Sequence, residues 1–393
     1  RMLVKRQTVC AFWALMISAG ALLSAAFKGF PPGGQIQGGS KSFEKKRSLH
    51  ETVFSGNGGE GNQKGCVLDS FTTDQGNVED IWQELISKFE ELSIYPRTKK
   101  NEVLSRIGDS DAVFSSKVII DDDVMEACPN LKYIGVLATG YNNVDLEAAT
   151  ARGIAVTNVP AYSSDSVAQT VFAYLLHDAV GVHEHLRAVE AGEWQKSPDF
   201  CFFAAPMNEL AGQNLVLVGS GGIGGAVGRI GPAFGMNVIF AELPGRSFPA
   251  GGRKEFPYPH AALPLGEALA RADVVSLHCP LTPATARLVD DAFLAQVKPG
   301  AVLVNTGRGP LVDEAAAARA LDRGALRLLY ADVLQVEPPP AAGPPSPLLL
   351  HPRARVTPHV AWGALAARRR LARAVAANVA AFREGRRLNR LDG

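Results

Sequence analysis

The sequence predicts an α/β protein whose strands alternate with helices and form parallel sheets. Three observations lead to this prediction. Short apolar strand patterns alternate with helical patterns from about residue 66 to the end of the chain, and a glycine-rich turn joins one of these strands directly to a helix. The composition is that of a globular protein, with 47% hydrophobic and 20% charged residues. The length of 393 residues favours two domains over one.

The charge balance and the cysteines argue against several classes of protein. A net charge of +1 gives no electrostatic reason to expect binding to nucleic acid or to an anionic membrane. The cysteines are far apart and form no CxxC pair, so we expect free or buried thiols, no disulfide framework and no metal site. The five cysteines are Cys10, Cys66, Cys128, Cys201 and Cys279.

The N-terminal 65 residues differ from the rest of the chain. Residues 9–27 contain no charged side chain and are flanked by basic residues, and their length lies between the core of a signal peptide and a minimal membrane span. Three interpretations stay open: a cleaved targeting segment, a membrane anchor, or an artefact of sequence assignment. Residues 29–65 are rich in Gly, Ser and Lys, which predicts a disordered linker. We expect membrane contact only if residues 9–27 are an uncleaved anchor. The expected location is cytoplasmic, or organellar if these residues are a targeting sequence.

The first series of elements begins near residue 66. Its strands are predicted from short runs rich in Val, Ile, Leu and Phe, and apolar residues at helical spacing predict a helix over Val78–Leu92. The alternation indicates βαβ units and therefore a parallel sheet. The four predicted strands are Gly65–Asp69, Asp111–Ser116, Leu131–Thr139 and Ile154–Pro160.

A long helical pattern, Asp165–Gly192, separates the first series from a second one, with Ser163 and Ser164 available as caps. A final helix is predicted over Ala364–Arg383, and the Pro- and Ala-rich stretch Glu337–Pro347 is expected to be a loop. The six predicted strands of the second series are Asn214–Gly219, Asn237–Glu242, Asp273–Cys279, Ala301–Gly307, Leu326–Val333 and Ala354–His359.

The turn after the strand Asn214–Gly219 has the spacing G-x-G-x-x-G at Gly219, Gly221 and Gly224. In a strand–turn–helix context, the first glycine permits a tight turn, the second lets the backbone approach a pyrophosphate, and the third lets the helix pack closely on the strand. Glu242 ends the next strand, 23 residues after Gly219, near the spacing of an acid that binds an adenosine ribose. The pattern therefore predicts dinucleotide binding; the alternative is a glycine-rich turn without a nucleotide.

The carboxylate of Glu242 favours NAD(H) over NADP(H), because it would repel a 2′-phosphate. Arg246, Arg253 and Lys254 lie a little downstream and could offset this repulsion, so NADP(H) stays open as an alternative.

Three charged or titratable residues follow neighbouring strands of the second series. Arg308, Glu337 and His359 stand where the carboxyl ends of parallel strands meet, so they are expected to converge although 29 and 22 residues separate them. A guanidinium between Gly307 and Gly309 has room to hold a small carboxylate bidentately. For Arg308 the alternative is a structural role, as a strand cap or as a partner of Asp332.

Glu337 and His359 suggest a joint role. A carboxylate bonded to one imidazole nitrogen favours the protonated imidazolium, which suits a general acid working near neutral pH. A histidine that follows a proline, taken alone, is more often structural.

Eight stretches carry a resemblance to a known family: "LATGYNNVD", "GIAVTNVPAYSSDSVAQT", "VGSGGIGGAV", "AFGMNVIFAE", "LHCPLT", "VNTGRGPLVDE", "DVLQVEPPP" and "TPHVAW". On these stretches, the chain from about residue 66 to its end resembles the D-isomer-specific 2-hydroxyacid dehydrogenases. Within them it is most similar to glycerate dehydrogenases, also called hydroxypyruvate (glyoxylate) reductases.

The resemblance implies two Rossmann-like domains with parallel sheets. A nucleotide-binding domain, residues 161–361, would be inserted into a flavodoxin-like substrate-binding domain, residues 66–160 and 362–393. The resemblance also implies a homodimer that forms through the nucleotide-binding domain, with the helix after Ser164 as a contributor.

The resemblance further implies a role for each matching residue. Arg308 would hold the substrate's carboxylate and carbonyl oxygen, His359 would exchange the proton, and Glu337 would orient and charge it. Substrate contacts are expected from Thr139, Gly140, Arg308 and Trp362. Cofactor contacts are expected from Gly219, Gly221, Gly222, Ile223 and Gly224 along the pyrophosphate turn, Glu242 at the ribose, Cys279 and Pro280 at the adenosine, and Thr306 and Asp332 at the nicotinamide, Asp332 through its carboxamide.

The expected activity is the reversible, NAD(P)H-dependent reduction of a short 2-oxo acid, hydroxypyruvate or glyoxylate, to D-glycerate or glycolate. An alternative is a dimeric, NAD-sensing corepressor-like binding protein of the same fold, which would keep the three site residues. A formate dehydrogenase of this fold is disfavoured because it would be expected to have glutamine in place of Glu337.

Overall fold

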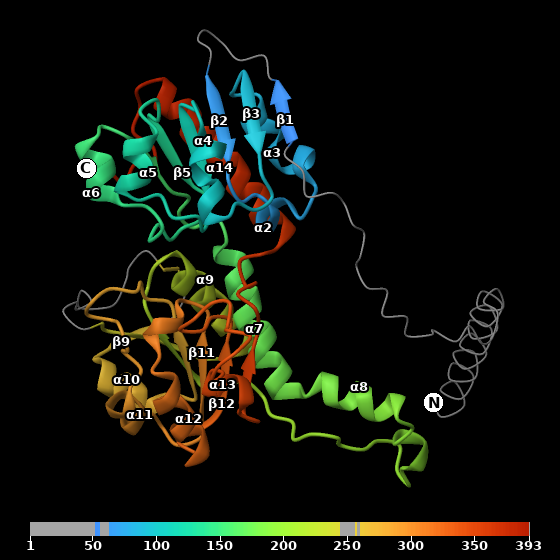
Figure 1. The fold of residues 1–393 in the computed structure, drawn as a ribbon. Coiled ribbons are helices and arrows are strands. Elements are labelled where there is room, and N and C mark those ends of the chain that lie inside the picture. Colours follow the sequence, from blue (N-terminus) through green and yellow to red (C-terminus); the bar gives the residue numbers. More distant parts are fainter. Residues whose placement is uncertain (1–51, 56–62, 244–255, 258–259, 393) are drawn as a thin grey trace, which may run out of the picture. The chain divides into compact units, whose positions relative to one another are not determined.

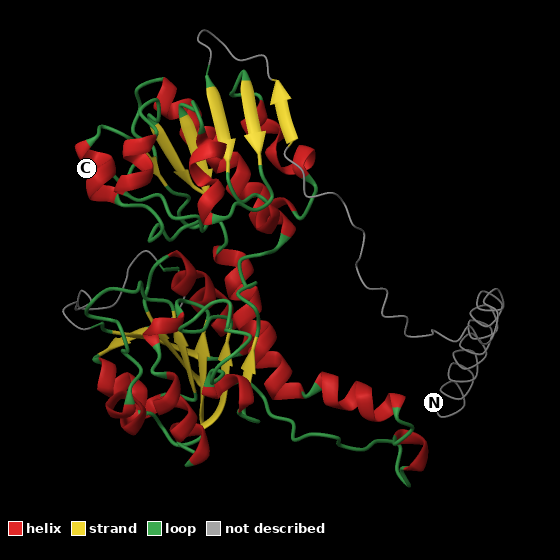
Figure 2. Cartoon of the chain, in the orientation of Figure 1, coloured by secondary structure: helices red, strands yellow, loops and turns green. Residues whose placement is uncertain are grey.

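The computed structural model describes residues 52–55, 63–243, 256–257 and 260–392, all within one compact unit that covers residues 49–393. The predictions for residues 9–27 and for Arg246, Arg253 and Lys254 lie outside the described residues. Two sheets with helices packed on them make up this part of the chain (Figure 1, Figure 2). The mixed α/β class with parallel sheets is confirmed.

The first sheet has the order β1-β3-β2-β4-β5-β6. Its pairs are parallel except for the edge pair β1–β3, which is antiparallel. Without β1, this is the strand order of flavodoxin-like domains. The strands are β1 (Thr52–Ser55), β2 (Lys64–Val67), β3 (Glu91–Ile94), β4 (Ala112–Ser115), β5 (Tyr133–Val136) and β6 (Ala155–Thr157).

The second sheet has the order β13-β12-β11-β10-β7-β8-β9 and is parallel throughout. This is the doubly wound order of a dinucleotide-binding domain, with the switch point between β7 and β10. The strands are β7 (Asn214–Val218), β8 (Asn237–Ala241), β9 (Ala261–Leu263), β10 (Val274–Leu277), β11 (Ala301–Asn305), β12 (Leu326–Ala331) and β13 (Ala354–Val356).

Short helices and helical turns connect these strands. The helices before the second sheet are α2 (Phe71–Asp74), α3 (Val78–Ile86), η1 (Lys100–Glu102), α4 (Val103–Ile107), α5 (Asp122–Ala127), α6 (Leu146–Ala151), α7 (Ser164–Val180), α8 (Val182–Glu190) and η2 (Trp194–Lys196). Those that follow are α9 (Gly222–Ile230), η3 (Gly231–Phe234), α10 (Leu265–Arg271), α11 (Asp291–Gln296), η4 (Gly309–Leu311), α12 (Glu314–Asp322), α13 (Pro347–Leu350) and α14 (Leu365–Arg383).

The last helix, α14, returns the chain to the first sheet. Its residues Leu371, Val375 and Val379 are buried in the same cluster as Trp82 and Phe114. Apolar side chains of α7 pack instead against the second sheet. The chain that forms the second sheet is therefore inserted between the strands of the first sheet and helix α14, which packs on them, as the sequence predicted. The domain limits at residues 160 and 361 stay a prediction.

Two predicted boundaries differ from the structure in the first unit. Thr52–Ser55, within the segment expected to be a linker, forms the edge strand β1, because Thr, Val and Phe favour extended backbone. The helix predicted over Val78–Leu92 ends at Ile86, and Leu92 belongs to β3. Leu92 and Ile94 are buried on one face of that strand, and the spacing of Leu92 from Phe89 imitated a helical turn.

The helix predicted over Asp165–Gly192 is two helices. Gly181 separates α7 from α8 and has a φ of +59°, a left-handed conformation that favours glycine and ends the first helix. Ser163 occupies the N-cap position of α7 but makes no capping hydrogen bond with its side chain.

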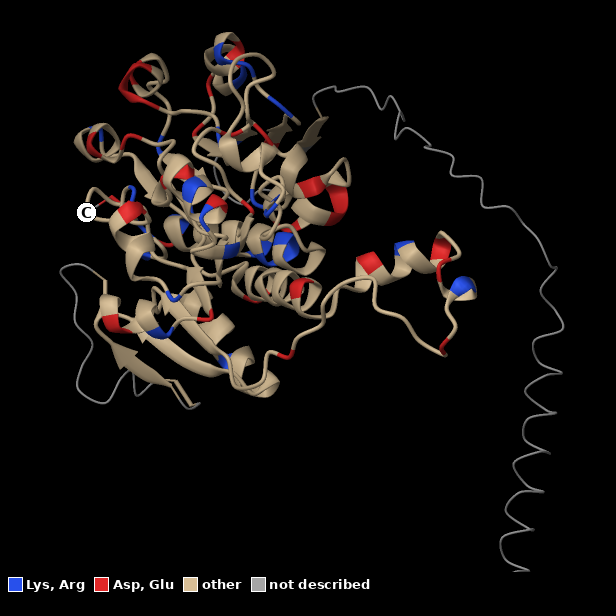
Figure 3. Cartoon of the chain, turned by 90° about the horizontal axis from the view of Figure 1, so that it is seen from below, with Lys and Arg blue, Asp and Glu red and all other residues tan. Residues whose placement is uncertain are grey.

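Charges of both signs are interspersed over the described residues in the view of Figure 3. None of the helices in this part of the chain has the length and apolar character to cross a membrane. Likewise, the described ranges contain no group of three or more His, Cys, Asp or Glu side chains placed to hold a metal ion.

Candidate active site

The glycine turn after β7 has no room for side chains at two of its glycines. Gly219 has a φ of +115°, and a Cβ there would lie 2.6 Å from the backbone of His278 and Cys279. A Cβ at Gly224 would overlap the carbonyl oxygen of Gly219. Gly221 differs, because a Cβ on it would meet no described atom within 4 Å. The first and third glycines are therefore needed by the fold, while the second borders open space.

These residues fit a bound nicotinamide dinucleotide. Helix α9 begins at Gly222, and its N-cap, Gly221, has no side chain to cap it, so the positive end of the helix dipole suits a phosphate. Ile223 lies in this first turn, and Glu242 directly follows β8. At the end of β11, the buried Thr306 hydroxyl has no hydrogen-bond partner among the described residues, as expected of a group that awaits a ligand.

His278 and Cys279 support this turn by packing rather than by chemistry. Burial lowers the pKa of His278 to about 3, so its imidazole is neutral, and its Nε2 lies 2.9 Å from the Ser276 hydroxyl. Burial raises the pKa of the Cys279 thiol to about 11, which makes it a poor nucleophile at neutral pH. The following residue, Pro280, is exposed, and its carbonyl accepts a bond from the Thr285 hydroxyl.

Arg308 stands on a loop that the surrounding backbone fixes. Asn305 donates from Nδ2 to the Arg308 carbonyl at 3.0 Å and accepts from the Gly307 N–H at 3.0 Å. The guanidinium donates from Nη1 to the Gly307 carbonyl at 2.9 Å. A Cβ at Gly309 would overlap the carbonyl of Leu334, so this position admits only glycine. The loop after β11 is thus pressed against the loop after β12.

The guanidinium of Arg308 lies against the backbone of Gly140, because a Cβ at Gly140 would overlap the Nη2 atom. Gly140 belongs to the loop after β5, which is tied down on both sides. The Thr139 hydroxyl donates to the Val159 carbonyl at 2.9 Å, and Asn158 Nδ2 donates to the Thr139 carbonyl at 2.7 Å. Two predicted substrate-binding elements, the "ATG" backbone and Arg308, therefore meet.

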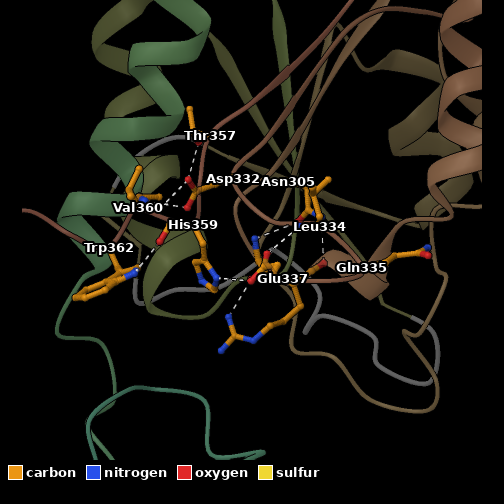
Figure 4. A network of polar contacts seen from close by, with 12 residues as sticks. Asn305, Asp332, Leu334, Gln335, Glu337, Thr357, His359, Val360 and Trp362 are labelled. Carbon is orange, nitrogen blue, oxygen red and sulfur yellow. Dashed lines mark hydrogen bonds and ion pairs between the residues drawn. The ribbon is translucent and has the colours of Figure 1, made fainter. Parts of the chain in front are cut away.

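His359 and Glu337 form the predicted pair. The imidazole Nδ1 lies 2.6 Å from Glu337 Oε2, and the Leu334 N–H donates to Glu337 Oε1 at 2.8 Å (Figure 4). Burial alone would raise the pKa of Glu337. The bonds from His359 and Leu334 and the positive charges of His359 and Arg308 outweigh it, so the pKa lies below its ordinary value. Glu337 is therefore ionised at neutral pH and lies within reach of the charge of Arg308.

The backbone at His359 is strained, with a φ of +53° that few residues other than glycine adopt. The His359 N–H donates to the carbonyl of Asp332 at 2.8 Å, and Trp362 Nε1 donates to the carbonyl of His359 at 2.9 Å. The Asp332 carboxylate accepts from the N–H groups of Val360 and Ala361 at 2.9 and 2.8 Å. Such strain persists only where neighbours hold it, and it is typical of functional sites.

Asp332 is buried, and its carboxylate makes a third bond, to the Thr357 hydroxyl at 2.6 Å. Within the described residues it forms no ion pair with Arg308, so the alternative in which Asp332 is the partner of that arginine finds no support there. A carboxylate offers about four acceptor sites. The predicted contact of Asp332 with a nicotinamide carboxamide therefore stays compatible with the three bonds and stays a prediction.

Tyr162 is a residue that the sequence reasoning did not single out. Its ring meets Trp362 edge to face, with 6.4 Å between centroids. Burial raises the pKa of Tyr162 to about 12, against opposing effects of a bond to Ser163 and of the positive charge of Arg308. Tyr162 thus contacts one predicted site residue, Trp362, and lies within reach of the charge of another, Arg308. The sequence feature that could have indicated Tyr162 is its place between β6 and α7, where the chain passes from the first sheet to the second.

Comparison with known proteins agrees with this geometry. A family model described as D-isomer specific 2-hydroxyacid dehydrogenase, NAD binding domain, matches residues 172–361. The chain is 36% identical over 326 residues to hydroxypyruvate reductase from Blautia hydrogenotrophica, a match that covers 82% of this chain and 98% of that protein. The chain belongs to the D-isomer specific 2-hydroxyacid dehydrogenase family.

Solved structures of two other proteins are similar to this dehydrogenase in sequence and in fold. The TT0316 protein from Thermus thermophilus is 35% identical, with a TM-score of 0.69 and coverage of 84% of this chain and 100% of that one. An NADPH-dependent glyoxylate/hydroxypyruvate reductase from Sinorhizobium meliloti, in complex with NADP and malonate, is 26% identical, with a TM-score of 0.68 and coverage of 84% and 97%.

The dehydrogenase is therefore an oxidoreductase that uses a nicotinamide cofactor, and the family named from the sequence is confirmed. The names of its relatives support reduction of 2-oxo acids at the level of the family.

The contact between Gly140 and Arg308 gives a testable expectation. Gly140→Ala places a methyl group where the Arg308 guanidinium lies, so the guanidinium must move. A misplacement of about 1 Å costs ~100-fold in rate, and we expect kcat/KM for a 2-oxo acid to fall by about this factor. Steady-state kinetics measure the loss, and NADH affinity, measured by fluorescence titration, serves as the control and should not change. A variant with unchanged kcat/KM would show that the guanidinium position is unimportant.

Proposed function

We propose that this dehydrogenase reduces a short 2-oxo acid, hydroxypyruvate or glyoxylate, to the corresponding D-glycerate or glycolate, with NADH as the preferred cofactor. The observation that carries the proposal is the His359–Glu337 pair, with a 2.6 Å bond, within reach of the charge of Arg308. The printed names of the relatives support the two substrates, since they include hydroxypyruvate reductase and glyoxylate/hydroxypyruvate reductase.

Arg308 binds the substrate in this proposal. Among the described residues its guanidinium makes one hydrogen bond, to the carbonyl of Gly307, and a guanidinium has five N–H donors to offer a ligand. A planar guanidinium matches a carboxylate bidentately and also stabilises negative charge on a neighbouring carbonyl oxygen. The backbone of Thr139 and Gly140 faces this group and supplies further N–H donors, and Trp362 bounds the substrate on the His359 side.

His359 exchanges the proton. Its Nδ1 is engaged by Glu337, so Nε2 is the ring nitrogen left to give a proton to the substrate oxygen. The ionised Glu337 accepts the bond from Nδ1 and fixes the ring orientation. The nicotinamide cofactor, when bound, supplies the hydride to the carbonyl carbon. Proton donation by His359 and charge stabilisation by Arg308 then complete the reduction.

The cofactor would lie along the turn after β7. Its pyrophosphate would contact the backbone of Gly219, Gly221 and Gly224 and of Gly222 and Ile223 at the start of α9, where the helix dipole favours an anion. Glu242 would bind the adenosine ribose and disfavour a 2′-phosphate, which supports the preference for NADH. Cys279 and Pro280 would border the adenosine, and Thr306 and Asp332 would border the nicotinamide.

The direct test measures NADH and NADPH oxidation with hydroxypyruvate, glyoxylate and longer 2-oxo acids. We expect turnover of the first two and a higher kcat/KM with NADH. His359→Ala should lower kcat by about 10²–10⁴-fold, because the proton donor is lost, while NADH binding persists. Full activity of this variant would overturn the assignment of His359. Cofactor and peptide binding without turnover by the unaltered protein would favour a corepressor-like function.

Glu337→Gln removes the charge beside His359 and keeps the side-chain shape. A neutral amide bonds the imidazole less strongly than a carboxylate does, so we expect kcat for reduction to fall. Because folding lowers the pKa of Glu337, its ionised form stabilises the fold above the pKa of the unfolded chain, and this stabilisation is lost as pH falls through the folded pKa. Unfolding at several pH values should show less acid sensitivity in the variant. An unchanged kcat in this variant would remove Glu337 from its role.

We further propose a homodimer in which a second copy covers α8 and the segment that follows it. No residue of α8 is buried, and this stretch exposes large apolar side chains that a monomer would leave in water. The exposed apolar residues, here called the α8 arm, are Val182, Leu186, Val189, Trp194, Phe200, Phe203 and Met207.

The arm gives an expectation for the oligomeric state. Phe200 and Phe203 are 89% and 74% exposed, so replacing both with Ser removes apolar area without opening a cavity in the fold. We expect the unaltered chain to sediment as a dimer at micromolar concentration and Phe200→Ser/Phe203→Ser to sediment as a monomer. Leu104→Ser/Ile119→Ser, which changes exposed apolar residues elsewhere, is the matched control and should stay dimeric. A dimer that survives the arm substitutions contradicts this interface.

A further inference from the structure

A chain of hydrogen bonds leads from α7 to the loop that carries His359. The Tyr174 hydroxyl lies 2.5 Å from the Thr357 hydroxyl, which lies 2.6 Å from Asp332 Oδ1. The same carboxylate holds the N–H groups of Val360 and Ala361, which directly follow His359. Tyr174 is 9% exposed, so this chain is largely shielded from water (Figure 4 shows its Thr357–Asp332 part).

The chemistry of these groups fixes which way each bond points. A carboxylate only accepts, so Thr357 donates its hydroxyl proton to Asp332. The Thr357 oxygen is then left as an acceptor, and Tyr174 must be the donor. Burial raises the pKa of Tyr174 to about 12, with the bond to Thr357 acting against burial and the charge of Asp332 adding to it, so the phenol keeps its proton at neutral pH.

The position of Tyr174 is itself well determined. Its ring is stacked on that of Tyr330, with 4.7 Å between centroids and 5° between the planes. Helix α7 also reaches the same segment through Ser166, whose hydroxyl donates to the Ala361 carbonyl at 2.7 Å. The helix thus fastens both sides of the backbone that is strained at His359.

We propose that Tyr174 is a positioning residue for the reaction: through Thr357 and Asp332 it holds the His359 backbone in its left-handed conformation and so keeps the imidazole bonded to Glu337. This inference rests on the proposed role of His359. Without the Tyr174 hydroxyl, Thr357 is free to rotate away from Asp332. The carboxylate then loses one of the three bonds that fix it opposite Val360 and Ala361, and the strained loop relaxes.

The experiment compares two Tyr→Phe variants of one stacked pair. Tyr174→Phe removes the hydroxyl that donates to Thr357 and keeps the ring. Tyr330→Phe is the matched control, because its buried hydroxyl has no partner among the described residues and its removal leaves the ring stack in place. We expect kcat of Tyr174→Phe to fall about fivefold to tenfold with an unchanged KM for NADH, and Tyr330→Phe to keep the activity of the unaltered enzyme.

Variants of Thr357 test whether the effect passes through this side chain. Thr357→Ser keeps a hydroxyl and should retain most of the activity, whereas Thr357→Val breaks both bonds and should lose at least as much as Tyr174→Phe. Because both changes interrupt one chain, Tyr174→Phe/Thr357→Val should be no slower than Thr357→Val alone. Losses that simply multiply in the double variant would show that Tyr174 acts by another route and would overturn the proposal.

A spectroscopic measurement separates this inference from the proposed function. The His359 imidazole resonance is assigned by its absence from the spectrum of His359→Gln, and it is observable whether or not a 2-oxo acid turns over. We expect Tyr174→Phe to displace this resonance and Tyr330→Phe to leave it in place. A displaced resonance in a protein that fails to reduce any 2-oxo acid would contradict only the function. An undisplaced resonance, or equal effects of the two Tyr→Phe changes, would overturn the inference.

Discussion

The Asp332 carboxylate is the group on which the geometry of the site depends. It lies buried at the end of β12 and accepts three hydrogen bonds from the segment that bears His359, while its backbone carbonyl accepts the His359 N–H. A left-handed backbone at a residue other than glycine costs about 1–3 kcal/mol, so these bonds must outweigh it. These bonds hold the backbone in the conformation that places the His359 imidazole beside Glu337. Removing the buried carboxylate would leave the N–H groups of Val360 and Ala361 without these hydrogen bonds. The same side chain therefore contributes both to the stability of the loop after β13 and to the position of His359.

Parallel strand order explains why residues far apart in the chain meet here. Strands β11, β12 and β13 are neighbours in the second sheet, and Arg308, Glu337 and His359 each follow one of them. All three loops leave the same edge of the sheet, so the charge of Arg308 and the His359 bond act together on the carboxyl group of Glu337. Because the sheet is parallel throughout, this edge also carries the glycine turn after β7. The proposed substrate and cofactor sites thus share one edge as a consequence of strand direction.

The sequence predicted this arrangement well wherever a strong local pattern ended at a distinctive residue. The pairing of Glu337 with His359 followed from counting strands and from Brändén's rule, whereas a shared substrate site for Arg308 and the "ATG" backbone was implied by the family resemblance. Other features left no local signal. The break at Gly181 was hidden by apolar residues that continue the helical period, and β3 was hidden because Phe89 and Leu92 happen to be three residues apart. Tyr162 contacts Trp362 and Tyr174 contacts Thr357, in both cases across a long stretch of sequence. The residue spacing around either tyrosine does not predict such a contact.

The glycines beside Arg308 explain why the guanidinium suits a small anion. Gly309 cannot carry a side chain because Leu334 occupies that space, and Gly140 cannot because the guanidinium does. Among the described residues no acidic side chain forms an ion pair with Arg308, and the carboxylate of Glu337, on which its charge acts, is bonded to His359. A guanidinium without a carboxylate partner favours the binding of an anion, and a planar carboxylate can accept two parallel hydrogen bonds from it. In the proposed reaction the substrate carboxylate would bind this guanidinium while its carbonyl oxygen meets His359, so the two side chains together favour a substrate whose carboxylate and carbonyl are adjacent. The position of the guanidinium depends on the backbone of Gly140 and Gly309, which lie where a side chain would overlap Arg308 and Leu334.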